Sequence, residues 1–483
     1  MASTEQVHTL QENLYIGGQW IGNGLQQLDV TNPANGELVG TVPLATRTEV
    51  QQAIDSAYRA FPTWAELPAR TRADLLKGVA ARMLERIDEL ARLMTIEQGK
   101  PLAEAKGEIR ISADYFEWNA EEAKRIYGET IPASTSNKRL LAIRQPVGVC
   151  AAITPWNFPS SMIARKIGPA LAAGCTVIVK PASATPLSAL AIAHIFDELG
   201  VPPGVMNVLL GSSSMVADEF LASPKIRKIS FTGSTEIGQQ LMQRAAHDLK
   251  RVSLELGGHA PFIVLDDADI EQAIAGVIGS KFRNAGQTCI CTNRLYVQRG
   301  IYDQFSQKLA ERVAQLHVGN GLEPSTEVGP MIDASAVTKV EQHVNDAVQR
   351  GGRVLAGGAR EHSQGSNFYQ PTLVADTPDD ALVAHEETFG PLLPMWAFDS
   401  DEEVIERANN TPYGLAAYIY GRDYARLIHA YEQLQYGIIG VNDSVPTVPQ
   451  APFGGVKHSG FGREGGHQGM DEYLDWKFVS IGL

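Results

Sequence analysis

From residue 147 onward, short apolar segments alternate with helical segments, and this alternation limits the fold more than any other feature of the sequence. The helical segments include PLSALAIAHIFDELG, which ends at Gly200. The segments with strand character are VGVCAAI (147–153), CTVIV (175–179), VMNVLL (205–210), KISF (228–231) and VSLEL (252–256). Strands separated by helices are typical of a mostly parallel, doubly wound sheet. We therefore predict an α/β fold.

A second run of the same kind begins at residue 260. It consists of APFIVLDDAD (260–269), RLYVQ (294–298), a helix at 301–317, LAAYIYG (415–421) and YGIIGVN (436–442). A chain of 483 residues is too long for one compact core. We predict two α/β domains, each with its own doubly wound parallel sheet, that meet near Gly257 and Gly258.

Three segments lie outside this alternation. Between residues 69 and 98, apolar residues recur at three- and four-residue steps and Gly99 follows, which predicts one long helix whose apolar stripe packs in the core. The segments 131–145 and 472–483 resemble strands that have no local partner. We expect these two segments to pair elsewhere, including across a subunit boundary.

Composition and charge exclude several classes of protein. The chain has 44% hydrophobic and 20% charged residues, as an ordinary globular protein does, and no apolar run is long enough to span a bilayer. The net charge of -14 argues against nucleic-acid binding, and an anionic ligand would need local arginines. The start of the chain lacks a secretory signal, and four cysteines are too few for a disulfide scaffold. We therefore expect a cytoplasmic protein with free thiols that does not bind membranes.

A glycine-rich turn is one place where a nucleotide could bind. KISFTGSTEIGQQLMQRA (228–245) has the form strand, turn and helix, and a helix N-terminus offers free N–H groups to a pyrophosphate. The spacing of Gly233 and Gly238 matches neither the usual dinucleotide fingerprint nor the Walker loop, so a tight turn without a ligand is an equal alternative. Lys180 ends a strand and is a candidate for ribose or phosphate contact, with a solvated lysine as the alternative.

Seven motifs occur together in the order and approximate spacing of one family. They are PWNFP (155–159), KPASATP (180–186), FTGSTEIG (231–238), ELGG (255–258), GQTC (286–289), EETFGP (386–391) and PFGGVKHSGFGREGG (452–466). In these motifs the chain resembles the aldehyde dehydrogenase superfamily over nearly its whole length. TIEQGKPLAEAKGE (95–108), PWNFPSSMIARKIGPALAAG and SKFRNAGQTC look most like the succinate-semialdehyde dehydrogenase branch.

The resemblance implies an aldehyde dehydrogenase-like fold with three parts. A cofactor-binding domain would comprise residues 1–128 and 150–256, and a catalytic domain residues 257–445. A small β oligomerisation element would comprise residues 129–149 and 467–483. A homodimer or homotetramer follows by the same resemblance.

The resemblance also implies the roles of individual residues. Cys289 would be the nucleophile and Glu255 the general base, and the Asn157 amide with the backbone N–H of Cys289 would bind the oxyanion. The residues implied for the cofactor are Lys180 and Glu387 for the ribose hydroxyls, Gly233 and Ser234 for the pyrophosphate, Phe389 beside the nicotinamide, and Thr154, Pro155, Trp156, Ser183 and Gly257 around them.

The chemistry of aldehyde oxidation needs these residue types. A thiolate adds to the carbonyl carbon, and the resulting thiohemiacetal can lose hydride to leave a thioester. A neutral amide such as Asn157 donates to the negative oxygen at every working pH, and a carboxylate such as Glu255 can take a proton from the water that cleaves the thioester. A CoA-acylating or phosphorylating relative would not need Glu255. A structural protein without activity would have no reason to keep these residues together.

Cys289 and Cys291 are separated by one residue, and four interpretations of the pair are a metal site, a disulfide, core packing, or one nucleophile with a bystander. A metal site is disfavoured because no second Cys or His pair has suitable spacing, and we expect no metal. Core packing suits Cys291 and does not suit Cys289. A disulfide between them would need a bent loop, because residues i and i+2 of an extended chain lie about 6.6 Å apart. We treat Cys291 as a candidate for redox regulation of the enzyme.

Two arginines are candidates for the substrate. Asn157 and Arg165 fall on one face of a predicted helix start, and Arg283 precedes Cys289 by six residues. In the resembled enzymes these arginine positions bind the distal carboxylate of succinate semialdehyde, with surface ion pairs as the alternative. Thr447 stands where those enzymes usually have a serine, so glutarate semialdehyde or another acidic aldehyde is an alternative substrate; Phe453 completes the predicted substrate site.

The predicted cofactor is NADP, with NAD tolerated. Relatives with an acidic residue at the position of Ser183 favour NAD, because that residue repels a 2'-phosphate. The small hydroxyl of Ser183 beside Lys180 can accept the phosphate.

Overall fold

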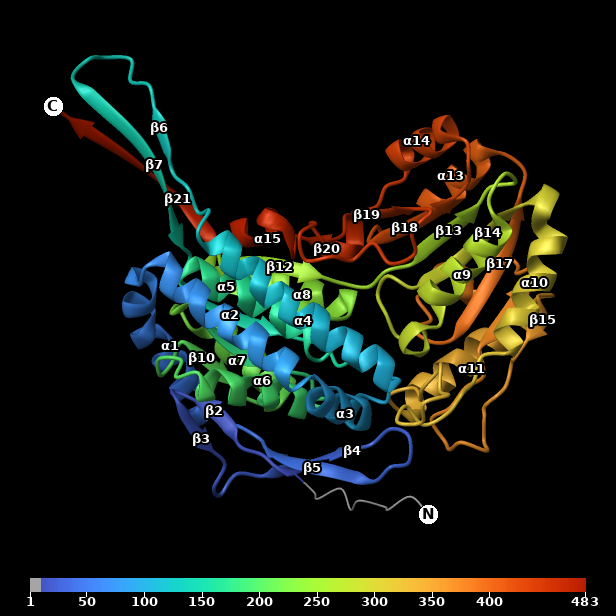
Figure 1. Ribbon diagram of the computed structural model, residues 1–483, viewed down its shortest axis with the longest axis horizontal. Helices are drawn as coiled ribbons and strands as arrows, with labels where there is room; N and C mark the ends of the chain where they lie inside the picture. The colour runs from blue at the N-terminus through green and yellow to red at the C-terminus, as the bar shows by residue number, and fades with distance from the viewer. Residues whose placement is uncertain (1–9) are drawn as a thin grey trace.

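The computed structural model describes residues 10–483 (Figure 1). The first nine residues lie outside this range. They contain the start of the predicted cofactor-binding domain and the start of the segment in which the sequence showed no secretory signal. Among the described residues, none of the helices is both long and apolar enough to cross a membrane.

The first large sheet has eight strands and contains all five strands predicted between residues 147 and 256. Its order is β20 (Gly460–Phe461), β12 (Arg251–Glu255), β11 (Ile226–Thr232), β8 (Val149–Ile153), β9 (Thr176–Lys180), β10 (Met206–Val208), β2 (Leu14–Ile16) and β3 (Gln19–Ile21). The five predicted strands run parallel to one another. The edge strands β20 and β2–β3 are antiparallel and were not predicted.

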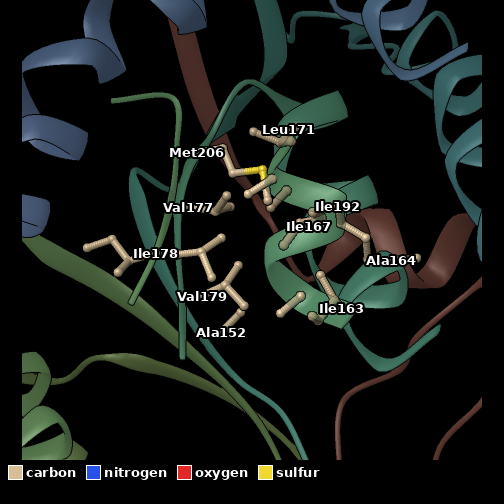
Figure 2. Close-up of a cluster of buried hydrophobic side chains, with 14 of the residues drawn as sticks. Ala152, Ile163, Ala164, Ile167, Leu171, Val177, Ile178, Val179, Ile192 and Met206 are labelled. Atoms are coloured by element: carbon tan, nitrogen blue, oxygen red, sulfur yellow. The ribbon is translucent and has the colours of Figure 1, made fainter. Parts of the chain in front are cut away.

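Helices pack against this sheet because their apolar faces meet its Val- and Ile-rich strands. They are α1 (Arg47–Glu66), α5 (Ser161–Ala173), α6 (Leu187–Glu198), α7 (Ser213–Ala222) and α8 (Thr235–Ala245). A further layer of α2 (Ala69–Glu85), α3 (Ile87–Gln98) and α4 (Leu102–Ala123) packs on α5 and α6. Figure 2 shows the core between α5 and β9, where Ile163 and Ile167 lie opposite Val177 and Val179, and all four are buried. Such burial is the main favourable term in folding.

The helix predicted at 69–98 is interrupted. Arg86 has φ -105° and ψ 21°, which separates α2 from α3. Gly99 has φ 100° and ends α3, as the sequence indicated. The chain then turns sharply into α4, and this corner between α3 and α4 reaches the second half of the molecule, since Leu102 donates from its N–H to the carbonyl of Gly321 (2.9 Å).

The second large sheet has seven strands and contains the four strands predicted after residue 259. Its order is β15 (Arg353–Ala356), β16 (Thr372–Ala375), β17 (Leu392–Phe398), β14 (Thr292–Gln298), β13 (Ala260–Val264), β18 (Ala416–Tyr420) and β19 (Ile438–Val441). All neighbours are parallel except β15 and β16. Its helices are α9 (Ile270–Lys281), α10 (Tyr302–Ala314), α11 (Ala334–Gln349), α12 (Leu382–His385), α13 (Asp401–Asn409) and α14 (Tyr424–Gln433). The short α15 (Gly466–Asp471) contacts α4 and α5.

A third sheet projects from the body of the molecule (Figure 1). This arm sheet consists of β21 (Leu474–Gly482), β7 (Lys138–Pro146) and β6 (Glu129–Ile131). The two segments predicted to lack a local partner pair with each other, from Leu474 opposite Pro146 to Gly482 opposite Lys138. A small N-terminal sheet of β1 (Leu10–Gln11), β5 (Leu38–Pro43) and β4 (Gln27–Thr31) was not predicted. The domain limits given by the sequence stay a prediction.

Candidate active site

A cavity of about 280 Å³ lies between α4, α5 and the loop that precedes β14. Five of the residues predicted for nucleophile and substrate come together in its wall, namely Cys289, Arg165, Arg283, Thr447 and Phe453. They belong to segments that are far apart in the sequence. It is therefore the fold, and not the local spacing of these residues, that brings them together. Phe158, directly after Asn157, also lines the cavity.

Cys289 lies on a tight turn and is half-buried. The backbone of Gly258 packs against the carbonyl of Cys289 so closely that a β-carbon on Gly258 would collide with it. Burial, with a smaller contribution from the Glu387 carboxylate, raises the pKa of the Cys289 thiol to about 12, and the Arg165 guanidinium opposes this shift. The resting side chain is therefore a thiol, and its environment must change for it to act as a thiolate.

Asn157 follows β8 and points its amide at the turn that carries Cys289. Its Nδ2 donates to the carbonyl of Gln287 at 3.0 Å, while its Oδ1 is buried without a partner. Because Gln287 is two residues before Cys289, the Asn157 amide lies beside the nucleophile turn. An amide in this position is available to a negative oxygen formed near Cys289.

Glu255 is the last residue of β12, and its side chain is buried with neither carboxylate oxygen hydrogen-bonded. Burial raises the pKa of Glu255 well above its ordinary value, and the nearby Glu464 carboxylate raises it further. Glu464 is itself paired with Lys166, whose Nζ lies 2.6 Å from Glu464 Oε1. A buried, unpaired carboxyl group of this kind suits proton transfer and does not suit a structural role.

Residues predicted for the cofactor lie at the carboxyl ends of adjacent parallel strands, where ligands of such sheets collect. Thr154 follows β8 and donates from its N–H to the carbonyl of Lys180, which ends β9 (3.2 Å). Gly233 follows β11 and donates to the carbonyl of Glu255 (3.1 Å). Ser234 caps α8 by accepting a hydrogen bond from the N–H of Ile237 (3.4 Å).

Lys180 and Ser183 form the part of this edge that suits a phosphate. The Lys180 side chain is buried, its Nζ donates only to the carbonyl of Pro181 (3.2 Å), and burial lowers its pKa to about 8. Ser183 is exposed three residues further along. A buried ammonium without a carboxylate partner is costly, which indicates that an anion completes its surroundings.

The loop before β17 meets the same edge from the second half of the molecule. Glu387 Oε1 accepts from the N–H of Gly258 (3.1 Å), and a β-carbon on Gly257 would lie 3.1 Å from Glu387 Oε2. Burial raises the pKa of Glu387 to about 7. The rings of Phe389 and Trp156 meet edge to face at 5.7 Å, and Pro155 precedes Trp156 at the same edge. The two halves are therefore in contact at this edge.

Unpaired donors surround the cavity. Arg165 is buried and stacks over the rings of Phe453 (4.4 Å) and Tyr115 (5.0 Å). In the described residues its Nε and Nη1 make no hydrogen bond, although Nη1 lies 4.0 Å from Glu464 Oε2. Nε of Arg283 and Oγ1 of Thr447 are also buried without partners. Since buried polar groups are nearly always satisfied, these donors indicate that the cavity receives an anionic group.

Cys291 is fully buried, and all four cysteines are free thiols. Its N–H donates to the carbonyl of Thr288 (3.2 Å), so the chain already turns between the two cysteines. The bent loop that a disulfide between them would need is therefore present in the reduced chain. Nζ of Lys281 lies 3.6 Å from the Cys291 sulfur, and burial raises the pKa of this thiol. A regulatory disulfide stays a prediction.

Several polar residues beside the site were not predicted from the sequence. Lys100 and Glu108 form a buried ion pair of 2.6 Å, and Asn284 bridges the loops that carry Asn157 and Cys289. One signal was available, since Lys100, Glu104 and Glu108 recur at four-residue steps in TIEQGKPLAEAKGE. That segment contributed only to the family resemblance. The carbonyl of Asn157, to which Lys100 and Asn284 both donate, lies 57 and 127 residues away from them.

The fold and the site together define an α/β protein with two large sheets and a half-buried thiol in the wall of a cavity. The chain belongs to the aldehyde dehydrogenase family, whose model matches residues 20–479. It is 55% identical to a succinate-semialdehyde dehydrogenase [NADP(+)] of Escherichia coli and 53% identical to a glutarate-semialdehyde dehydrogenase of Pseudomonas aeruginosa, in each case over 98% of both chains. The crystal structure of a succinate-semialdehyde dehydrogenase from Burkholderia pseudomallei superposes with a TM-score of 0.97, at 48% identity over 98% of each chain.

Proposed function

We propose that this protein oxidises an aldehyde with a distal carboxylate to the corresponding dicarboxylate, with succinate semialdehyde as its substrate and NADP or NAD as its cofactor. The observation that carries the proposal is the group of unpaired donors of Arg165, Arg283 and Thr447 in the cavity that holds Cys289. The relatives named for semialdehydes, at 55% and 53% identity, support it.

In the proposed reaction Cys289 attacks the carbonyl carbon as a thiolate. The Asn157 amide and the N–H of Cys289 stabilise the oxyanion of the thiohemiacetal. When bound, the nicotinamide cofactor supplies a hydride acceptor, and loss of hydride leaves a thioester on Cys289. Glu255 then takes a proton from the water that cleaves this thioester. Its raised pKa suits a group that must accept a proton and release it again.

Hydrolysis by Glu255 has a direct test. Glu255→Gln keeps the size of the side chain and removes the base, so a single burst of reduced cofactor followed by a stall is expected. Rapid-mixing absorbance at 340 nm measures the burst amplitude against the concentration of Cys289. Steady turnover at the wild-type rate would exclude Glu255 as the base and favour acyl transfer to a different nucleophile.

The residues predicted to hold the cofactor at the carboxyl ends of the strands fit NADP. Lys180 lacks an anionic partner and Ser183 is exposed nearby, so a 2'-phosphate would find a cation and a hydroxyl, and no carboxylate lies at the position of Ser183. The Escherichia coli relative is named for NADP(+). Comparing kcat/KM for the two cofactors tests the preference, and a strong preference for NAD would contradict it. Ser183→Glu should shift the ratio towards NAD, because a carboxylate repels the phosphate.

Glutarate semialdehyde is the second candidate substrate. Thr447 replaces the serine usual at this position in the resembled enzymes, and the Pseudomonas aeruginosa relative is named for glutarate semialdehyde. A panel of semialdehydes of increasing length, with uncharged aldehydes of matching length, decides between them. Equal kcat/KM for charged and uncharged members would remove the role of the distal carboxylate altogether.

We also propose a homo-oligomer assembled through the arm sheet and a cytoplasmic location. Trp476 and Phe478 are more than half exposed on β21, which supports their burial against another copy of the chain. The four free thiols support a reducing compartment. Light scattering of the purified protein tests the assembly, and fractionation of cells that produce it tests the location.

A further inference from the structure

The corner between α3 and α4 contacts both loops of the active site. These loops come from different halves of the molecule, since Asn157 follows β8 of the first large sheet and Asn284 precedes β14 of the second. Gln98 ends α3 and Lys100 precedes α4, so two side chains only two residues apart reach one loop each. Neither residue has a role in the proposed reaction as set out above.

Lys100 holds the loop of Asn157. Its Nζ is fully buried, donates to the carbonyl of Asn157 at 2.8 Å, and lies 2.6 Å from Glu108 Oε2. The same ammonium lies 4.0 Å from the centre of the Phe158 ring. The other oxygen of Glu108 accepts from the N–H groups of Ser160 and Ser161, where α5 begins (2.9 and 3.1 Å). Lys100 and Glu108 thus fix the segment after β8 at Asn157, Phe158, Ser160 and Ser161.

Gln98 holds the turn of Asn284. Its Nε2 donates to Asn284 Oδ1 at 3.0 Å, and its own Oε1 accepts from the N–H of Lys100 (3.0 Å). This contact orients the Asn284 amide, whose Nδ2 donates to the carbonyls of Asn157 (3.0 Å) and Gln287 (3.2 Å). Asn284 has a φ of 51°, an unfavourable conformation for a residue with a β-carbon, and the surrounding bonds maintain it.

We propose that Lys100 and Gln98 are positioning residues that set the Asn157 amide against the turn of Cys289, Lys100 acting through the main-chain carbonyl of Asn157. The proposal rests on the oxyanion role of Asn157 given above. The two donors that meet at this carbonyl, from Lys100 and Asn284, define the direction of the peptide and with it the direction of the side chain. A displacement of about 1 Å in such a group costs as much as a hundred-fold in rate.

A plain structural role for Lys100 is the competing explanation. Lys100 neutralises Glu108, and removing one member of a buried ion pair destabilises a protein because the other charge is left unpaired. Burial lowers the pKa of Lys100, and the Glu108 carboxylate opposes that shift, so the pair is the main electrostatic support of the ammonium. An experiment therefore has to separate the loss of the pair from the loss of the bond to Asn157.

Three variants make this separation. Lys100→Met removes the ammonium. The double variant Lys100→Met, Glu108→Gln removes both charges and leaves no unpaired carboxylate. Lys106→Met, the control, replaces a lysine by methionine at an exposed position of α4. We expect kcat to fall at least ten-fold in the first two, with the KM for succinate semialdehyde changed less than three-fold, and to stay unchanged in Lys106→Met. Thermal unfolding curves of the three variants show whether each protein is folded at the temperature of the assay.

A double-mutant cycle with Asn157→Ala asks whether Lys100 acts through Asn157. In the Asn157→Ala background, Lys100→Met should lower kcat by less than two-fold, because the amide that it positions is gone. Recovery of kcat to within two-fold of wild type in the Lys100→Met, Glu108→Gln protein would overturn the proposal and leave only charge neutralisation. A rise in KM with kcat unchanged, or additive losses in the cycle, would overturn it as well. Absence of aldehyde oxidation by the wild-type protein would instead reject the proposed function.

Discussion

At the scale of single residues, the cavity combines a thiol that is hard to ionise with guanidinium groups whose hydrogen-bonding capacity is only partly used. Arg165 and Arg283 each keep a buried nitrogen without an acceptor, and the cavity wall contains the carboxylates of Glu104 and Glu108. Glu108 is paired with Lys100, and Glu104 accepts a hydrogen bond from the N–H of Asn284 (2.8 Å). In the described residues no ion pair joins either arginine to these two carboxylates. Arg165 Nη1 lies 4.0 Å from Glu464 Oε2, but Glu464 is held more closely by Lys166 (2.6 Å), so the guanidinium groups remain available to a substrate.

Arg283→Ala should weaken binding of a charged substrate selectively. A hydrogen bond to a charged group contributes about 1.5–3 kcal/mol, so kcat/KM for succinate semialdehyde should fall about ten- to hundred-fold, mainly through KM. An uncharged aldehyde of the same length should change less than three-fold. Arg299→Ala is the matched control, because Arg299 is exposed and pairs with Asp399 at the surface. Equal losses for both aldehydes would contradict the role of Arg283.

The pH dependence of Cys289 follows from its raised pKa. The thiolate is the reactive form, and a thiol whose pKa is raised to about 12 is almost entirely protonated at pH 7. In the absence of cofactor and substrate, the rate of alkylation by iodoacetamide should therefore rise about ten-fold per pH unit between pH 7 and 10. Cys289→Ala measures the background from the three other cysteines. A rate that levels off below pH 8 would show that burial does not govern this thiol.

At the scale of elements, the turn that carries Cys289 is fixed by its neighbours. Gly258, between β12 and β13, is in contact with the carbonyl of Cys289, and Gly286 packs against the carbonyl of Gly390 with a φ of 73°. The corner of α3 and α4 adds the contacts to Asn284 and Asn157. The nucleophile thus depends on elements of both halves of the molecule.

Gly258→Ala should displace this turn. The added β-carbon would overlap the Cys289 carbonyl, and overpacking of this kind costs about 1–3 kcal/mol. We expect kcat to fall ten-fold or more with a lower unfolding temperature. Gly279→Ala is the control, because Gly279 lies inside α9 and alanine favours a helix. A β-carbon at this position would contact only Ser444 Oγ, at an ordinary distance of 3.7 Å. If Gly258→Ala had the kcat of the wild type, the turn that carries Cys289 would tolerate the displacement, and the prediction would be wrong.

Periodicity predicted the elements that depend on local sequence and missed those that depend on distant partners. The parallel strands β8 to β12 were predicted because their apolar runs alternate with helices. The break at Arg86 was missed because the apolar stripe continues across it, and the strands β2 and β3 were missed because they are short edge strands. For the site, the family motifs located Cys289 and its neighbours. Lys100 and Gln98 could not be found this way, since their partners lie 57 and 186 residues away.

At the scale of the whole molecule, the arm sheet is the part whose exposed apolar side chains are not accounted for by contacts within one chain. Its three strands project from the body, and the contact between Arg144 and the Trp476 ring (4.6 Å) covers only part of its surface. Trp476 and Phe478, which lie on one face of β21, remain exposed at 53% and 63%, and Ile481 on the opposite face at 43%. Since exposed clusters of large apolar side chains mark interaction surfaces, we expect this sheet to be buried in an assembly.

Replacing Trp476 and Phe478 by lysine should therefore separate the subunits. Two buried charges would oppose association, whereas the antiparallel pairing of β21 with β7 uses the backbone and should persist. Light scattering should give a mass near 52.3 kDa for the variant and a multiple of it for the wild type. Lys477→Ala, between the two positions, is the control for a change on the same strand. A wild-type protein that already has the mass of one chain would reject the assembly, and an unchanged variant mass would place the interface on another surface.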